Sequence, residues 1–293
     1  MENYSVLMAV YYREQAEYLH QAIDSMLCQT VPPEEFVLVC DGPLTQALDA
    51  VITKYQVAQP ERFQIIRLER NMGLGAALHI GLQCCRNELV ARMDSDDIAV
   101  TDRMEAQLAQ LRCFPGTAVL GGQIAEFWSV PECVMSYREV PQEPQEILQF
   151  AKSRNPMNHV TVLLRKSAVL EAGNYSQTVS PGFEDYYLWV TLLAKGYELR
   201  NISKVCCKVR VSEGQYARRG GWRFFQNAMQ VMRLLKKQRM ISHIRLWMNT
   251  AVWFAGTMLI PTGFRKQLLL RFLRRQESFE EAPQVCGRGK LLL

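Results

Sequence analysis

The chain has 293 residues, of which 48% are hydrophobic and 22% charged, so it can bury a sizeable core and is not intrinsically disordered. Its charge is unevenly divided, because residues 1–209 carry 18 basic and 25 acidic side chains whereas residues 210–293 carry 16 and 4. The nine cysteines form no CxxC pair, which argues against a zinc site or a redox disulfide and predicts reduced cysteines in a protein core. The N-terminus lacks the basic region of a secretory signal, so we expect a cytoplasmic protein.

Short apolar runs alternate with segments of helical periodicity over the first hundred residues. Apolar runs between helices predict strands that are buried on both faces, which is typical of a parallel α/β sheet. This region, residues 1–100, is therefore predicted to be a nucleotide-binding half. The predicted strands are Val6–Val10, Phe36–Cys40, Phe63–Leu68 and Leu89–Met93, and the predicted helices are Tyr18–Leu27, Leu44–Tyr55 and Gly73–Cys85.

The alternation weakens after residue 100, where short apolar pieces lie among proline-bearing turns. Val119–Leu120, Ile124–Trp128 and Val160–Leu164 are such pieces, and a helix over Asp185–Ala194 precedes a strand at Val205–Val211. We expect residues 101–210 to close the sheet and shape an acceptor cleft. The predicted organisation is one α/β domain over residues 1–210, followed by a basic helical tail over residues 211–293.

The densest functional pattern is Asp94-Ser95-Asp96-Asp97, directly after a predicted strand. Three carboxylates in four residues repel one another unless a cation neutralises them, and ligands of α/β sheets bind where the strands end. The pattern favours Mg²⁺ or Mn²⁺ shared with a diphosphate, with Asp94, Asp96 and Asp97 as ligands. The alternative is a solvated acidic loop before the next helix.

Two turns follow the second and third strands. Asp41 ends the second strand, where a carboxylate can accept hydrogen bonds from a base or a ribose, although Asp-Gly-Pro is also ordinary turn chemistry. Asn71 and Gly73 precede a predicted helix, whose N-terminus favours phosphate. A dinucleotide-binding Rossmann fingerprint is excluded, because its third glycine position holds Leu78.

Three further positions could act on the acceptor or the diphosphate. Glu184 and Asp185 open a helix, so they could cap it or supply a general base for an acceptor hydroxyl. His159 is a lone histidine near a strand start, with a structural role as the alternative. The pair Arg218-Arg219 could neutralise a departing diphosphate or form a solvated basic loop.

Together these segments resemble family 2 glycosyltransferases of the GT-A fold, over about residues 4–210. The resemblance extends to enzymes of bacterial exopolysaccharide, capsule or lipopolysaccharide assembly, the amylovoran-biosynthesis type included. Ala9 stands where the family usually has proline, and Cys40 where many members have a first aspartate. The segments that carry it are Ser5–Tyr12, Leu38–Pro43, Arg70–Gly73, Met93–Asp97 and Phe183–Asp185.

The resemblance implies an inverting transfer of a sugar from a nucleotide sugar, with UDP expected, to a glycan or lipid-linked saccharide. Asp185 would act as the base beside Glu184, and a divalent ion would bind the aspartate segment. Two alternatives are a nucleotidyltransferase, which would have a glycine-rich first loop, and a non-catalytic scaffold that binds nucleotide sugars. The expected donor contacts are Ala9, Tyr11, Glu14, Asp41, Asn71, Gly73, Arg92, Asp94 and Ser95.

The tail interleaves basic and bulky apolar residues. Its apolar stretch Leu246–Ile260 is shorter than the roughly 20 residues that span a bilayer. Such a segment is typical of a helix in a membrane interface, so we expect a peripheral protein on the anionic inner face of the cell membrane. Nucleic-acid binding is disfavoured because the tail is too apolar, and the remaining alternative is packing against the catalytic domain.

Overall fold

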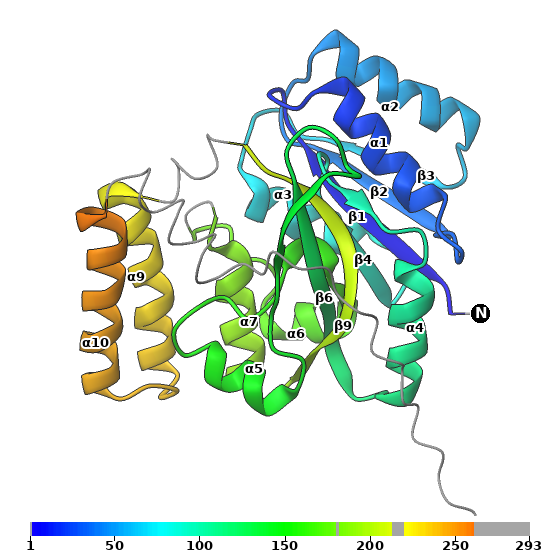
Figure 1. The fold of residues 1–293 in the computed structure, drawn as a ribbon. Coiled ribbons are helices and arrows are strands. Elements are labelled where there is room, and N and C mark those ends of the chain that lie inside the picture. The colour runs from blue at the N-terminus through cyan, green and yellow to red at the C-terminus, as the bar shows by residue number, and fades with distance from the viewer. Residues whose placement is uncertain (1, 180–181, 213–219, 261–293) are drawn as a thin grey trace, which may run out of the picture.

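The computed structural model describes residues 2–179, 182–212 and 220–260, and it is a layered α/β structure (Figure 1). Nine strands form one sheet in the order β3-β2-β1-β4-β8-β6-β9-β5, with β7 paired to β6. This confirms the predicted α/β fold.

The N-terminal half is the parallel part of the sheet. The strands β1 (Tyr4–Val10), β2 (Glu35–Cys40), β3 (Phe63–Arg67) and β4 (Leu89–Met93) pair in parallel, so their carboxyl ends meet at one edge. The helices between them are α1 (Ala16–Leu27), α2 (Gln46–Ala58) and α3 (Leu74–Cys84).

The C-terminal half extends the sheet with mixed pairing. Long β6 pairs in parallel with β9 and antiparallel with β7 and β8, while β8 joins this half to β4. The strands are β5 (Ile98–Ala99), β6 (Thr117–Phe127), β7 (Val134–Arg138), β8 (Leu163–Arg165) and β9 (Glu198–Arg210). The helices are α4 (Arg103–Cys113), α5 (Pro144–Phe150), the 3₁₀ turn η1 (His159–Thr161), α6 (Lys166–Ala172) and α7 (Glu184–Ala194).

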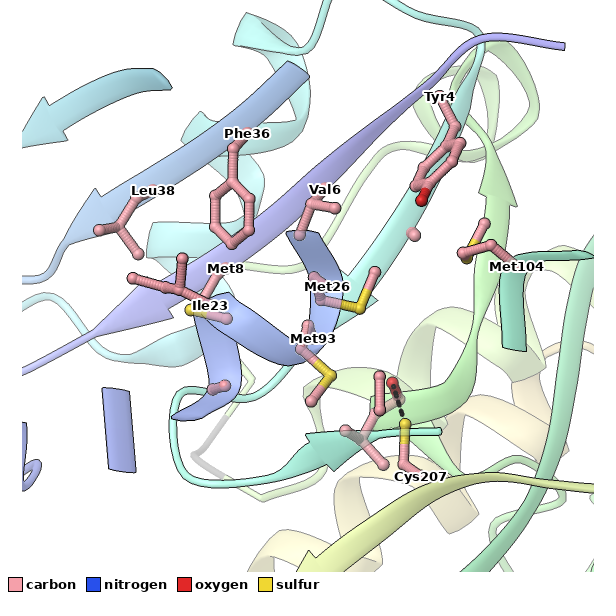
Figure 2. Packing of buried hydrophobic residues seen from close by; sticks show 14 of the residues in the cluster. Tyr4, Val6, Met8, Ile23, Met26, Phe36, Leu38, Met93, Met104 and Cys207 are labelled. Atoms are coloured by element: carbon pink, nitrogen blue, oxygen red, sulfur yellow. Dashed lines mark hydrogen bonds between the residues drawn. The ribbon is translucent and has the colours of Figure 1, made fainter. Parts of the chain in front are cut away.

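Alternate residues of the central strands face two separate hydrophobic cores, one on each side of the sheet. In β1, Val6 and Met8 face the core beneath α1, α2 and α4, whereas Leu7 faces the core beneath α3 and α7. Figure 2 shows the first core, where Ile23 and Met26 of α1 lie over the strands. Because both faces are covered, the central strands consist almost wholly of apolar residues, as the sequence pattern predicted.

A helical hairpin follows β9, made of α9 (Gly221–Lys237), α10 (His243–Phe254) and the π-helix η2 (Ala255–Leu259). The apolar side of α9 packs against α7, and α10 lies on the outer side of α9 (Figure 1). For α9, packing on the catalytic domain is therefore the correct interpretation of its apolar stripe. In the described part of the chain, no helix is long and apolar enough to cross a bilayer.

Two local expectations were wrong. The pieces predicted around Val119 and Ile124 form one continuous strand, β6, because Gly121 and Gln123 between them are buried and pair with β9. Cys28, Cys113 and Cys133 are exposed, so the expectation of core cysteines holds only for the others described. Cys286 lies outside the described residues.

The junction between β2 and the following loops requires a glycine. Gly42 has φ +90°, and a Cβ there would lie 2.6 Å from the backbone nitrogen of Asn71. We expect Gly42→Ala to destabilise the protein by about 2–4 kcal/mol in urea denaturation, from left-handed strain and this backbone clash.

Gly116→Ala is the matched control, since Gly116 is exposed and a Cβ there would meet nothing within 4 Å. It should change the unfolding free energy by less than about 1 kcal/mol. Equal effects of the two substitutions would contradict the role given to Gly42.

Candidate active site

The carboxyl ends of β1, β2 and β4 bring the predicted donor residues to one edge of the sheet. Val10 pairs with Cys40, and the backbone N–H of Asp41 donates to the carbonyl of Val10 at 2.8 Å. Ala9 and Tyr11 lie half-buried at the end of β1. The parallel register of β1 and β4 places Asp94 beside them.

Asp41 organises the neighbouring turn. Its carboxylate oxygens accept the backbone N–H groups of Met72 at 2.7 Å and Gly73 at 2.9 Å, and Asn71 Nδ2 donates to the Asp41 carbonyl. Gly73 has φ +88° and stands directly before α3. Asp41 therefore has the structural role in a turn that the sequence left open. Asn71 is exposed on the outer side of this turn.

Arg92 is the buried cation of the site. Its side chain is 2% exposed, and both terminal guanidinium nitrogens donate to the Asp94 carboxylate. Its Nε has no hydrogen-bond partner among the described residues. The guanidinium is thus paired with Asp94 beneath the surface, and a direct donor contact through Arg92 stays a prediction.

The three aspartates of the acidic segment have different surroundings. Asp94 is paired with Arg92, and buried Asp97 accepts the backbone N–H of Arg210 at 2.8 Å. Burial and then the negative charges of Asp94 and Glu14 raise the pKa of Asp96 to about 7. Burial, Asp96 and Asp94 raise the pKa of Asp97 as well. The predicted mutual repulsion is thus present.

The chemistry of this donor set fits a divalent cation at Asp96. Asp96 is a partly exposed carboxylate, and its neighbour Glu14 accepts the Ser95 hydroxyl at 2.8 Å. In the described residues, no group of three His, Cys, Asp or Glu side chains is arranged to hold a metal alone. A hard cation here would need oxygen ligands from outside the protein, which is how Mg²⁺ is usually held beside a diphosphate. Asp97 is buried and already accepts the Arg210 N–H, and its role as a metal ligand stays a prediction.

Glu184 and Asp185 begin α7, near enough to Arg92 for its charge to act on both carboxylates. Asp185 is held by Asn155, whose Nδ2 donates to Oδ2 at 2.7 Å, and it also accepts the Tyr186 backbone N–H. Burial and then Asp185 raise the pKa of Glu184 to about 7. Burial also raises the pKa of Asp185, against the lowering effects of Asn155 and, more weakly, Arg92.

His159 lies against Tyr175 and Trp189. Its Nε2 is 2.9 Å from the Tyr175 hydroxyl, and its ring meets the Trp189 ring edge-on at 5.8 Å. Burial and the nearby Arg92 hold the pKa of His159 well below its usual value, so the imidazole is neutral. The structure therefore places His159 against Tyr175 and Trp189 and near Arg92. Arg218 and Arg219 lie outside the described residues.

Comparison with known proteins identifies the family of the chain. The profile described as "Glycosyl transferase family 2" matches residues 5–172. The chain belongs to the family 2 glycosyltransferases.

Two relatives and one solved structure are informative. The amylovoran biosynthesis glycosyltransferase AmsE of Erwinia amylovora is 35% identical over 242 residues, 83% of this chain and 89% of its own. The UDP-Gal:alpha-D-GlcNAc-diphosphoundecaprenol beta-1,3-galactosyltransferase of Escherichia coli is 33% identical, over 93% and 97%. The mannosyltransferase PcManGT from Pyrobaculum calidifontis, solved with GDP-Man and Mn²⁺, has a TM-score of 0.60 at 15% identity, over 91% of this chain and 78% of its own.

Three residues of this glycosyltransferase site were not predicted from the sequence. Asn155 and Tyr175 bond to Asp185 and His159, and Arg210 binds the acidic segment through its backbone N–H and through Nε to the Asp96 carbonyl. Asn155 stands only four residues before His159, so the sequence could have indicated that it lies near this candidate residue. Tyr175 and Arg210 carry no local signal, because only tertiary packing brings them to the site.

The raised pKa of Glu184 predicts a pH dependence of stability. An acid whose pKa is raised on folding binds a proton more tightly when folded, so stability is lost as pH rises from about 4.5 through about 7. Glu184→Gln keeps the oxygen that accepts the Gly182 N–H and removes the charge. We expect this variant to be more stable than the wild type at pH 8 by about 1–3 kcal/mol, and equally stable at pH 4, by urea denaturation. The same difference at both pH values would contradict this assignment.

Proposed function

We propose that the protein is an inverting glycosyltransferase that transfers a sugar from a UDP-sugar to a lipid-linked saccharide in bacterial surface polysaccharide assembly. The observation that carries the proposal is the arrangement of charge around Arg92. The charge of this buried guanidinium opposes the rise in the pKa of Asp96, Glu184 and Asp185 alike. The acidic segment at the donor edge and the Glu184–Asp185 pair, to which the proposal gives different tasks, therefore both lie near Arg92.

In this proposal the acidic segment serves the donor. Asp94 and Ser95 would contact the nucleotide, while Asp96 would hold Mg²⁺ or Mn²⁺ against the diphosphate. The ion would stabilise the negative charge that develops on the leaving nucleoside diphosphate. Asp41 would act through the turn that it organises, and the outward-facing Asn71 and the half-buried Tyr11 would contact the nucleotide at the strand ends.

Asp185 would serve the acceptor. Its Oδ1 and Oδ2 each accept one hydrogen bond, and the remaining lone pairs can take the proton of an attacking hydroxyl. A single base with no covalent sugar intermediate inverts the anomeric centre. Neutral His159, which lies against Tyr175, would accept a hydrogen bond from a sugar hydroxyl without adding a charge.

The names of the relatives support the substrate classes. The Escherichia coli relative uses UDP-Gal and a saccharide on diphosphoundecaprenol, and the Erwinia relative serves amylovoran biosynthesis. The mannosyltransferase with Mn²⁺ supports the metal only through its shared fold.

The base assignment is tested by Asp185→Asn. The variant keeps the shape of the side chain and one of its two acceptor oxygens, but an amide cannot take a proton. We expect the transfer rate from UDP-galactose to α-GlcNAc-diphosphoundecaprenol to fall about 10²–10⁴-fold. Donor binding should persist, seen as an equal rise in melting temperature with UDP-galactose and Mn²⁺ in both proteins.

The outcomes of this experiment separate the alternatives. Wild-type protein that binds UDP-sugars but transfers none would favour a nucleotide-sugar-binding scaffold. Release of diphosphate from a nucleoside triphosphate and a sugar phosphate would favour a nucleotidyltransferase. Full activity of Asp185→Asn would refute the base assignment.

We also propose that the outer face of α10 rests on an anionic membrane surface. This face leaves Trp247 73% and Val252 71% exposed, next to Ile244, Met248 and Leu259. Residues 220–260 contain six basic and no acidic side chains, with Arg239 and Arg245 at the exposed surface. Exposed apolar residues with basic neighbours suit an interfacial helix and would bring the site to lipid-linked saccharides.

Vesicle binding tests this surface. We expect Val252→Glu to lower the fraction bound to phosphatidylglycerol vesicles about tenfold or more, since it removes apolar burial and adds repulsion. Val57→Glu on α2 is the matched control, because Val57 is also exposed, at 75%, and should leave binding unchanged. Equal binding of both variants, or equal binding to phosphatidylcholine vesicles, would contradict the proposal.

A further inference from the structure

The helical hairpin of α9 and α10 contacts the residue before Glu184 and the segment that carries Asn155, the partner of Asp185. The first contact is aromatic, since Phe183, the residue directly before Glu184, packs its ring 5.0 Å from that of Phe224 and 5.9 Å from that of Trp253. Phe224 belongs to α9 and Trp253 to α10. The start of α7 is thereby fixed against both helices of the hairpin.

The second contact reaches the partner of Asp185. Asn249 of α10 is buried, and its Nδ2 donates to the Lys152 carbonyl at 2.7 Å. Lys152 opens the short segment that ends at Asn155, the residue that donates to Asp185. The same segment is tied to α7 by the Tyr186 hydroxyl, which donates to the Ala151 carbonyl at 2.7 Å. Residues 151–155 are therefore held between α10 and the start of α7.

Asn249 and Trp253 are four residues apart, so they lie on one face of α10. That face points to the catalytic domain, while Val252 and Trp247 lie exposed on the other. We infer that the α9–α10 hairpin positions Asp185 for proton transfer, with Asn249 and Trp253 as positioning residues. This inference rests on the proposed role of Asp185.

Proton transfer requires a precisely placed base. A base must stay within hydrogen-bond reach of the hydroxyl that it deprotonates, and a displacement of about 1 Å can cost 10²-fold in rate. The backbone before Asp185 and the amide that orients its carboxylate are both attached to α10. Loss of either attachment frees the carboxylate without removing any group that contacts the donor.

The test compares Asn249→Ala and Trp253→Ala with Trp253→Phe and Val57→Ala. The first two should lower kcat for UDP-galactose and α-GlcNAc-diphosphoundecaprenol about 10–100-fold, with the donor KM changed less than about twofold. Trp253→Phe keeps a ring against Phe183 and should recover most of the rate. Val57→Ala changes an exposed residue of α2, outside the hairpin, and should match the wild type.

Two further measurements separate positioning from a general loss of structure. Weakening the Asn155–Asp185 bond removes an interaction that favours the ionised carboxylate, so the acidic limb of the kcat profile should move to higher pH in Asn249→Ala. Amide hydrogen exchange should accelerate at residues 184–187 and stay unchanged in α3. Unchanged exchange at residues 184–187, or a rate loss without movement of the acidic limb, would overturn the inference.

Failure of the proposed function would look different. If Asp185→Asn keeps full activity, or if the wild type transfers no sugar, the role of Asp185 as base is wrong. The exchange measurement needs no substrate and still decides whether α10 holds the start of α7.

Discussion

The candidate active site of this glycosyltransferase is built around the ion pair between buried Arg92 and Asp94. Moving a cation out of water costs several kcal/mol, so Arg92 is tolerable in the interior only with carboxylates around it. Asp94 supplies the direct pair, and the remaining acidic groups belong to two segments that are about ninety residues apart in the sequence. The charge of Arg92 therefore favours a fold in which those segments converge.

The positive charge of Arg92 does not neutralise all the carboxylates around it. Asp94 consumes the guanidinium hydrogen bonds, yet Asp96 and Glu184 still have pKa values raised to about 7. Such a pocket is a poor place for free carboxylates and a good one for a cation on the donor side and a proton on the acceptor side. The excess of carboxylates that destabilises the folded protein would, in the proposed function, bind the cation and take up the proton that sugar transfer requires.

The sequence was most informative where structure repeats locally. Strands buried on both faces produce unbroken apolar runs, so the first four strands and their helices followed from periodicity. The acidic segment and the Glu184–Asp185 pair were also found, because strand ends and helix starts have short-range signals. The buried state of Arg92 had no such signal, since a charged residue inside an apolar strand can equally well face a ligand. Arg210 and Tyr175 reach the site only through tertiary packing, which no local pattern encodes.

The C-terminal hairpin shows what composition alone left undecided about the tail. Basic and apolar residues are interleaved along α9, whereas α10 is mostly apolar; α9 packs its apolar side against α7, and α10 keeps large apolar residues exposed. Periodicity identifies an apolar stripe without saying what covers it. The family profile ends at residue 172, before Glu184 and Asp185, yet the hairpin packs directly against the start of α7. The exposed helix α10 and the start of α7 are therefore parts of one packed unit, so under the proposed function a change on the hairpin's inner face would reach Asp185.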